Sequence, residues 1–366
     1  MRIAITADWL VTKGGAERVI AEMLTLWPDA PLFTTVARAK CLAPLTPDVR
    51  VSRLQKLYRI LPEHRLLIPF MPKAVESWDL RGYDVILSSS HAVAKGCIPQ
   101  DNALHICYCH TPMRYAWAME EEYLKDFGLR GPLRFLAKRE LKKLRSWDLS
   151  TPKRVDLFIA NSKSIADRIA TIYGRESIVL TPPIHDRFLM APLLPHENYF
   201  LAVGRLVPYK KFDLLIEVAN ASRLRLKIAG EGPGGTRLRK MAGPTVEFLG
   251  RVSDDDLPAL YARARAVLFP VHEDAGLVPL EAQACGTPVI ALRKGGALDT
   301  VMEGKTGLFF DQQTVEALQA ALRKFEGMQF DSSVLREHAK QFSGERFRSK
   351  LRGVVEKTFS SRAHSA

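Results

Sequence analysis

Short, largely apolar segments rich in Val, Ile, Leu and Phe recur along the whole chain, separated by longer segments of helical character. Strands that are apolar throughout are typical of sheets covered on both faces, and intervening helices make such sheets parallel. The sequence therefore predicts an α/β protein with parallel sheets. The expected strands are 2–7, 84–89, 103–109, 157–161 and 177–181, followed by 199–204, 224–230, 246–250, 266–270, 288–292 and 307–310.

A proline-rich segment divides these strands into two sets. Residues 181–198 hold four prolines and show no clear periodicity, which is typical of an interdomain linker. Because 366 residues exceed the size at which one core usually keeps growing, two domains are expected. We expect Rossmann-like domains at 1–187 and 195–344, with a basic amphipathic helix at about 345–366 packing back on the first.

The charge balance favours phosphate-bearing partners. Lys and Arg total 53 against 40 Asp and Glu, a formal charge of +13 that attracts nucleotides, nucleic acid or anionic lipid alike. No apolar run is long enough to span a membrane and no secretion signal is recognisable, so we expect a cytoplasmic protein. Five cysteines without a regular framework fit a reducing compartment, and Cys107-Tyr108-Cys109-His110 lacks a second ligand pair, so no metal is expected.

Two places in the first half are candidate ligand contacts. Gly14 and Gly15 precede a helical segment, where the backbone can approach a ligand and free amides favour a phosphate. A tight turn alone is the alternative. His110 follows strand 103–109, and ligands of open α/β sheets bind beyond the carboxyl ends of the strands. A single histidine there can equally be structural.

Two cations follow the first strand of the second half. Arg205 and Lys210 come after strand 199–204, next to a glycine that permits a turn. A planar guanidinium and a mobile ammonium together suit a diphosphate, whose charge rises as the bond to its sugar breaks. Ordinary solvated surface charge is the alternative.

Two carboxylates flank the loop after strand 266–270. Glu273 falls in this loop, and Glu281 is expected in the first turn of a helix that Pro279 opens. Both can then face one ligand, and carboxylates accept hydrogen bonds from vicinal sugar or ribose hydroxyls. Glu281 could instead complement the helix dipole.

Residues 230–235 satisfy the dinucleotide-binding pattern G-x-G-x-x-G, but a proline stands inside the loop. The next strand ends in Gly250-Arg251 where an acid would bind a ribose. We therefore do not expect NAD binding.

In this order the motifs resemble those of the retaining glycosyltransferases of the GT-B fold, family four. Within that family they resemble the bacterial mannosyltransferase-like branch of O-antigen and exopolysaccharide assembly. The resemblance covers nearly the whole chain. It is carried by Gly14-Gly15-Ala16-Glu17, Tyr108-Cys109-His110-Thr111-Pro112, Ala160-Asn161-Ser162, Gly204-Arg205 through Lys210, Gly230-Glu231-Gly232-Pro233, and Glu273 with Glu281.

The resemblance implies two Rossmann-like domains whose parallel sheets face each other across a cleft, the first binding the acceptor and the second the nucleotide sugar. It implies that Gly15 approaches the donor phosphate, that His110 contacts the transferred sugar and that Glu281 binds the ribose. The residues it assigns to catalysis are His110, Arg205, Lys210 and Glu273. Those it assigns to donor binding are Gly14, Gly15, Arg205, Lys210, Glu273, Ala275, Gly276, Leu277 and Glu281. Ala275 departs from the family, which usually has an aromatic residue there.

The implied reaction is transfer of a hexose with retention of anomeric configuration to a glycan or lipid-linked glycan. GDP-mannose is favoured over a UDP-sugar as the donor, and no other cofactor is expected. No divalent metal is expected, because the cations serve the leaving group and no Asp-x-Asp stands where a metal would bind. The alternatives are a sugar-nucleotide epimerase of the same shape and a nucleic-acid-binding protein, but we find no nucleic-acid recognition motif and expect no such partner.

Two basic stretches contain interleaved apolar residues, at 53–73 and 125–154. Basic amphipathic helices with aromatic residues can lie on an anionic membrane, where a lipid-linked acceptor would be met. We therefore expect an anionic membrane surface as a partner, on the inner face of the cytoplasmic membrane. A solvated helix with its apolar side in the core is the alternative.

Overall fold

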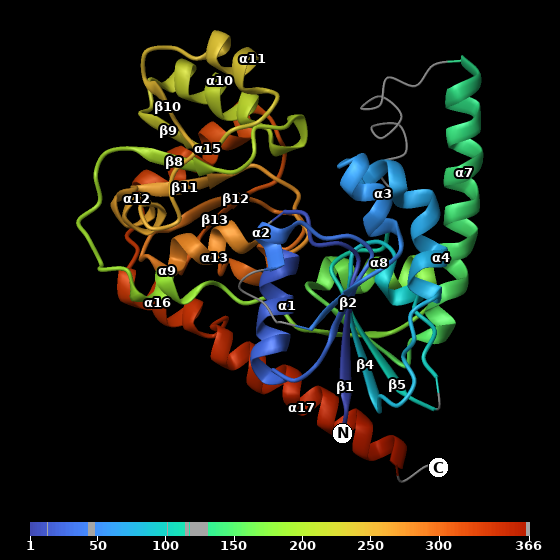
Figure 1. Ribbon diagram of the computed structural model, residues 1–366. Helices are drawn as coiled ribbons and strands as arrows, with labels where there is room; N and C mark the ends of the chain where they lie inside the picture. Colours follow the sequence, from blue (N-terminus) through green and yellow to red (C-terminus); the bar gives the residue numbers. More distant parts are fainter. Residues whose placement is uncertain (13, 43–47, 101, 114–116, 118–130, 364–366) are drawn as a thin grey trace. The chain divides into compact units, whose positions relative to one another are not determined.

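The computed structural model describes residues 1–363 except 13, 43–47, 101, 114–116 and 118–130 (Figure 1). The chain divides into two compact units. Unit 1 comprises residues 1–182 and 347–366, and unit 2 comprises residues 183–346. Among the described residues, no helix is both long and apolar enough to cross a membrane.

Unit 1 is built on a parallel sheet of seven strands in the order β3-β2-β1-β4-β5-β6-β7. Its strands are β1 (Ile3–Ala7), β2 (Leu32–Thr34), β3 (Val49–Val51), β4 (Val85–Ser90), β5 (Leu104–Cys109), β6 (Leu157–Ala160) and β7 (Ser177–Val179). Its α-helices are α1 (Gly15–Leu26), α2 (Ala39–Leu42), α3 (Leu54–Ile60), α4 (Met71–Glu76), α7 (Gly131–Ser150), α8 (Lys163–Tyr173) and most of α17 (Gly344–Ala363). Its 3-10 helices are η1 (His64–Phe70), η2 (Ala94–Gly96) and η3 (Thr151–Arg154).

Alternate residues of β1 point into the two cores of this sheet. Ile3 and Ile5 belong to one core, together with apolar side chains of α1 and α17. Ala4 belongs to the other, together with side chains of α3, η1, α4 and α7. This alternation is the period-two geometry of a strand, so helices cover both faces.

The last helix buries one side against unit 1. Phe347, Leu351 and Val355, spaced four residues apart on one helix face, are buried in the core that contains α1. The ring of Phe347 lies edge-on to that of Tyr108, with centroids 5.8 Å apart, and Arg348 forms an ion pair with Glu22. Residues 364–366 of the predicted helix lie outside the described residues.

Unit 2 is built on a parallel sheet of six strands in the order β10-β9-β8-β11-β12-β13. Its strands are β8 (Phe200–Val203), β9 (Leu226–Ala229), β10 (Val246–Gly250), β11 (Ala266–Phe269), β12 (Val289–Leu292) and β13 (Gly307–Phe310). Its helices are α9 (Asp186–Met190), η4 (Pro208–Lys210), α10 (Phe212–Ser222), α11 (Gly235–Met241), α12 (Leu257–Arg263), α13 (Leu277–Ala284), α14 (Ala297–Thr300), α15 (Val315–Glu326) and α16 (Ser332–Lys340).

All eleven predicted strands are confirmed, with ends that differ from the prediction by at most two residues. The sequence does not predict the two short strands β2 and β3, which have three residues each. The segment at 181–198 is not wholly irregular, since it contains α9, whose Phe188 is buried against Tyr261.

The glycines at 230–235 serve the packing of two loops. A Cβ at Gly230 would clash with the backbone of Gly204, and a Cβ at Gly232 would lie 2.6 Å from the carbonyl oxygen of Leu206. The loop after β9 therefore lies directly against the loop after β8. Close backbone approach explains these glycines without a dinucleotide.

Both sheets contain a point where the strand order reverses. In unit 1 it lies between β1 and β4, and in unit 2 between β8 and β11. Chains leave the two central strands toward opposite sides, which opens a crevice at the carboxyl ends of those strands. These two reversal points are where the fold itself favours a ligand.

Candidate functional site

Lys210 and Glu273 meet at the reversal point of unit 2. Lys210 ends η4 in the connection after β8, and Glu273 lies in the loop after β11. Their side chains form an ion pair and are 11% and 22% exposed. The structure thus brings together two of the predicted catalytic residues, one cation and one carboxylate.

Arg205 lies in the same connection as Lys210. It follows Gly204 at the end of β8, and its side chain is exposed. Gly204 has a φ of +151°, and the backbone N–H of Val207 donates to the Arg205 carbonyl at 2.8 Å. The turn therefore carries both cations beyond the carboxyl end of one strand, and the diphosphate role stays a prediction.

The loop that carries Glu273 is braced by a second loop. The backbone N–H of Gly296 donates to the Glu273 carbonyl at 2.8 Å. Gly276 has a φ of +63°, and a Cβ there would lie 2.7 Å from the carbonyl oxygen of Gly296. This close approach fixes the backbone around half-buried Ala275, next to the start of α13 at Leu277.

The predicted position of Glu281 in its helix is wrong. Helix α13 begins at Leu277, so Pro279 is its third residue and Glu281 its fifth. A proline is tolerated at any of the first positions, because their N–H groups have no partner within the helix, and it does not mark the first residue. The alternative role of Glu281 at the helix dipole is therefore also excluded.

Glu281 is nearly buried and has a partner in unit 2. Its side chain is 9% exposed and accepts a hydrogen bond from the Tyr261 hydroxyl at 3.2 Å. Tyr261 belongs to α12 and is itself fully buried. The Tyr261 hydroxyl therefore already orients the carboxylate that is predicted to bind the ribose. The ribose contact of Glu281 itself stays a prediction.

His110 directly follows β5 and is held on several sides. Its Nε2 lies 2.9 Å from the Ser89 hydroxyl, and its carbonyl accepts a hydrogen bond from Asn161 Nδ2 at 2.9 Å. The ring of Tyr108 lies 5.0 Å away. The residues of two motifs, Tyr108 with His110 and Asn161, therefore meet at one edge of the sheet.

Gly14 and Gly15 precede and begin α1, as the phosphate prediction requires. The Glu17 carboxylate lies close to Gly14 and accepts hydrogen bonds from the backbone of Gly14 and Glu17. Burial raises the pKa of this carboxyl more than those hydrogen bonds lower it. The amides at the start of α1 therefore face a carboxylate here, and the phosphate contact stays a prediction.

The sequence does not single out Asp8 and His91, whose side chains are in contact at the same edge of unit 1. Asp8 follows β1, His91 follows β4, and His91 Nδ1 lies 2.9 Å from Asp8 Oδ2. A polar residue directly after each of two neighbouring strands is a signal that could have found them. The sequence does not show that these two residues are neighbours, because it does not reveal that β1 pairs with β4.

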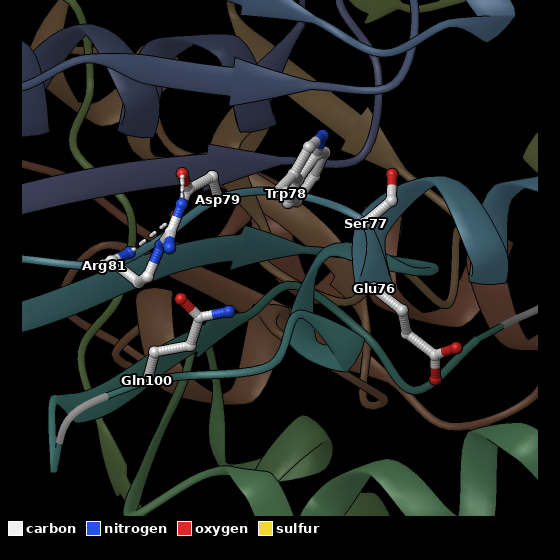
Figure 2. A pocket seen from close by; sticks show the side chains of 6 residues that line it. All are labelled: Glu76, Ser77, Trp78, Asp79, Arg81 and Gln100. Atoms are coloured by element: carbon white, nitrogen blue, oxygen red, sulfur yellow. Dashed lines mark hydrogen bonds and ion pairs between the residues drawn. The ribbon is translucent and has the colours of Figure 1, made fainter.

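A surface pocket of about 560 Å³ lies elsewhere in unit 1 (Figure 2). It is lined by Glu76, Ser77, Trp78, Asp79, Arg81 and Gln100. These residues come before β4 and β5 in the sequence, so the pocket lies at the amino ends of the strands. It is therefore separate from the carboxyl edge that holds the predicted residues.

The cysteines are all free and buried. Cys107 and Cys109 lie on β5, where residues two apart share one face of the strand. Within the described part of the chain, no group of three or more His, Cys, Asp or Glu could hold a metal ion.

Matches to known protein families divide the chain at nearly the same place as the two compact units. The family described as "Glycosyltransferase Family 4" matches residues 13–187, and the family described as "Glycosyl transferases group 1" matches residues 192–342. The chain belongs to the glycosyltransferases. The two matches together span most of the chain, and each lies mainly in one unit.

Curated relatives of this glycosyltransferase include enzymes with two different names. A "D-inositol 3-phosphate glycosyltransferase" of Salinispora arenicola is 34% identical over 43% of this chain and 44% of the relative. A "GDP-mannose-dependent alpha-(1-6)-phosphatidylinositol monomannoside mannosyltransferase" of Mycolicibacterium smegmatis is 37% identical over 44% of this chain and 50% of the relative. The chain spans about half the length of the curated relatives it matches.

Solved structures show the same fold. Anabaena Alr3699/HepE in complex with UDP has a TM-score of 0.69 at 16% identity, over 98% of this chain and 100% of that chain. The lipopolysaccharide outer core galactosyltransferase WaaB in its apo form has a TM-score of 0.71 at 14% identity, with the same coverage. With the two parallel sheets, these likenesses confirm the predicted GT-B class of Rossmann-like domains.

Proposed function

We propose that this glycosyltransferase moves a hexosyl group from a nucleotide sugar to a glycan or lipid-linked glycan in cell-surface polysaccharide synthesis, such as that of O-antigen or exopolysaccharide. The observation that carries the proposal is the Lys210–Glu273 ion pair at the reversal point of unit 2. A cation and a carboxylate side by side suit a ligand that carries a phosphate next to sugar hydroxyls. A nucleotide sugar has this combination of groups.

The donor contacts both residues of this pair and separates them. A diphosphate oxygen takes the place of the Glu273 carboxylate on Lys210, and a vicinal pair of sugar hydroxyls replaces Lys210 on Glu273. Both side chains are partly exposed, so the exchange needs no unfolding of the loops. Arg205, exposed in the same connection, adds a second cation to the diphosphate.

GDP-mannose is the donor we favour. The relative from Mycolicibacterium smegmatis is named as GDP-mannose-dependent, and its matched part overlaps this chain over 192 residues. The Anabaena structure contains UDP, but at 16% identity it supports the fold only. Mannose is therefore our choice for the transferred sugar, with a UDP-sugar as the second choice.

Transfer proceeds with retention of configuration. The acceptor hydroxyl attacks on the face from which the nucleoside diphosphate departs, and a leaving phosphate oxygen accepts the hydroxyl proton. The protein then needs no strong base, but it must stabilise the growing negative charge on the diphosphate. Arg205 and Lys210 supply this stabilisation in place of a divalent metal, so added chelator should leave the rate unchanged.

The enzyme works in the cytoplasm, peripherally on an anionic membrane surface. Helix α3 and helix η1 expose Ile60 and Phe70 (82% and 56%), and α7 exposes Phe135 (74%). Exposed lysines of α7, Lys142 and Lys143, supply positive charge. Exposed apolar side chains near basic ones fit the interface of an anionic bilayer. Residues 125–130 of the second basic stretch lie outside the described residues.

Vesicle sedimentation tests the membrane contact. We expect the protein to sediment with phosphatidylglycerol-containing vesicles at low salt, to be released as salt rises, and to stay in solution with pure phosphatidylcholine. The variant Lys142→Glu with Lys143→Glu should bind more weakly. Equal binding to charged and uncharged vesicles would contradict this part of the proposal.

A ligand screen tests the donor. We expect GDP and GDP-mannose to raise the melting temperature of the protein more than UDP, ADP or their sugars, since ligands that bind the folded state stabilise it. Labelled GDP-mannose should then pass its sugar to an acceptor from a panel that includes octyl α-mannoside and phosphatidylinositol. A changed sugar in the absence of acceptor would indicate an epimerase, and no shift with any nucleotide would refute the proposed site.

A further inference from the structure

The reversal point of unit 1 carries a histidine and an aspartate to which no role has been given. Asp8 and His91 are the first residues after β1 and β4, the two strands between which the order reverses. The register pairs Ala7 with Ser89, so the two chains leave the sheet at nearly the same level. The pair therefore lies where a ligand of this fold is expected.

The Asp8 carboxylate is built to remain charged. It accepts hydrogen bonds from four successive backbone N–H groups, those of residues 91–94, at 2.6, 3.1, 2.5 and 2.6 Å. Although burial raises its pKa, the neighbouring His91 and these hydrogen bonds hold the pKa well below the usual range. Asp8 is only 1% exposed, so it cannot reach a ligand itself. Its role is to position His91.

His91 is oriented by this carboxylate. The contact of Nδ1 with Asp8 Oδ2 places a proton on Nδ1, which in the neutral ring makes Nε2 the hydrogen-bond acceptor. The edge of Trp9 packs against the ring with centroids 4.6 Å apart. The imidazole remains 27% exposed. A fixed ring, a fixed tautomer and access to solvent are what a contact to a hydroxyl donor requires.

The charges that surround His91 distinguish between two kinds of ligand. The carboxylates of Asp8 and Glu17 both act on it electrostatically, and Glu17 accepts hydrogen bonds from two backbone N–H groups at the start of α1, its own and that of Gly14. The neighbouring rings are those of His64, which acts on it through charge, and His110, whose centroid lies 6.4 Å away. Of the charged groups that the structure describes around His91, these two carboxylates disfavour a phosphate group. They favour an uncharged ligand that donates hydrogen bonds, namely a hydroxyl.

We propose that His91, positioned by Asp8, accepts a hydrogen bond at Nε2 from a hydroxyl of the acceptor that neighbours the attacking one, and that the acceptor at this subsite is an uncharged sugar or polyol ring. This inference rests on the proposed function and adds the acceptor side of the site. The attacking hydroxyl keeps its single proton for the leaving diphosphate, and His91 forms no covalent bond. The two reversal points then hold the two substrates, the donor in unit 2 and the acceptor in unit 1.

Two substitutions at His91 separate acceptor binding from a structural role. His91→Asn keeps an amide donor near the position of Nδ1, next to Asp8, but has no atom in place of Nε2. His91→Gln can place a carbonyl oxygen near the position of Nε2 but loses the contact with Asp8. The probes are GDP-mannose as the donor and octyl α-mannoside or myo-inositol, whichever reacts faster, as the acceptor.

We expect His91→Asn to lower kcat/KM for the acceptor by about 100-fold, the size of effect that misplacing a reactant can have. His91→Gln should lose less, about 10-fold, the equivalent of one hydrogen bond. The dissociation constant for GDP-mannose and its slow hydrolysis by water should remain unchanged in both. His196→Gln, in the segment before β8, is the control and should behave as the wild type. If His91→Asn retained more acceptor activity than His91→Gln, or if both matched the wild type, the proposal would be wrong.

A second measurement needs no acceptor. Long-range proton–nitrogen spectra of histidine-labelled protein should show the proton of neutral His91 on Nδ1, with its signals assigned by their loss in His91→Asn. A proton on Nε2 would overturn the proposal even if the enzyme transfers mannose. Conversely, a protein that binds no nucleotide sugar but shows the expected tautomer would contradict the proposed function and not the geometry of the pair.

Discussion

The residue pairs at the two reversal points differ in how rigidly the protein holds them. In unit 1, Asp8 is buried and held by four backbone N–H groups, so that only its partner His91 is accessible. In unit 2, Lys210 and Glu273 reach each other as side chains and both stay partly exposed. A backbone-bound charge is fixed by folding, whereas a pair of side chains can separate when a ligand arrives. The difference predicts that mutations at the first pair affect stability and mutations at the second affect activity.

The largest expected effect is on the stability of unit 1. Asp8→Asn should lower the free energy of unfolding by about 3–5 kcal/mol, because breaking a buried, fully hydrogen-bonded charge leaves its partners unsatisfied. Chemical denaturation followed by circular dichroism measures the loss. Asp79→Asn, at an exposed carboxylate paired with Arg81, is the matched control and should change little. A stable Asp8→Asn protein would remove the contrast between the two pairs.

The next effect is on transfer by unit 2. Lys210→Ala should raise the barrier for transfer by roughly 3–4 kcal/mol, as when one strong donor to a developing negative charge is lost. Initial rates with GDP-mannose measure kcat, and the melting temperature without ligand should stay close to that of the wild type. Lys240→Ala, on the exposed side of α11, controls for loss of a positive charge. Equal rates for the two variants would place the diphosphate elsewhere.

A smaller effect, confined to mildly acidic pH, is expected at Glu17. Its folded-state pKa is raised, so between the unfolded and folded pKa values the folded protein binds more protons. The free energy of unfolding should therefore fall as pH rises through this window, and Glu17→Gln should lack this fall. Asp8, with its lowered pKa, has the opposite sign: its contribution is lost only as the pH falls below the usual range for carboxylates. Denaturant titrations at several pH values distinguish the two.

The smallest expected effect is that of Glu273 on stability, and it tests most directly the contrast between the two residue pairs. Glu273→Gln should change the free energy of unfolding by less than about 1 kcal/mol, since Gln keeps the size of Glu and its side-chain oxygen can still accept a hydrogen bond from Lys210. The same variant should nevertheless bind GDP-mannose more weakly while its affinity for GDP changes little. Isothermal titration with both ligands gives the answer. A large loss of stability would show that Glu273 is structural.

Several features of the site could be predicted from the sequence because they depend on neighbours along the chain. Glycines before α1 and after β8, and His110 after β5, follow from strand ends that an apolar pattern marks. The start of α13 could not be placed, because Pro279 is compatible with more than one position in the first turn. Glu281 consequently lies two residues further into the helix than predicted, in contact with Tyr261. That contact depends on how α12 packs on α13, which no local pattern encodes.

The sequence by itself determined the strands, the two sets into which they fall and the family, since apolar patterns and motifs depend only on residues that are close together in the sequence. Only the tertiary structure decided which strands are neighbours, and with them the meeting of Asp8 with His91 and of Lys210 with Glu273. The members of each pair lie more than sixty residues apart in the sequence. Pairing of the strands brings them together. Which strands pair depends on contacts between residues far apart in the sequence, since both faces of the sheet must be buried at once.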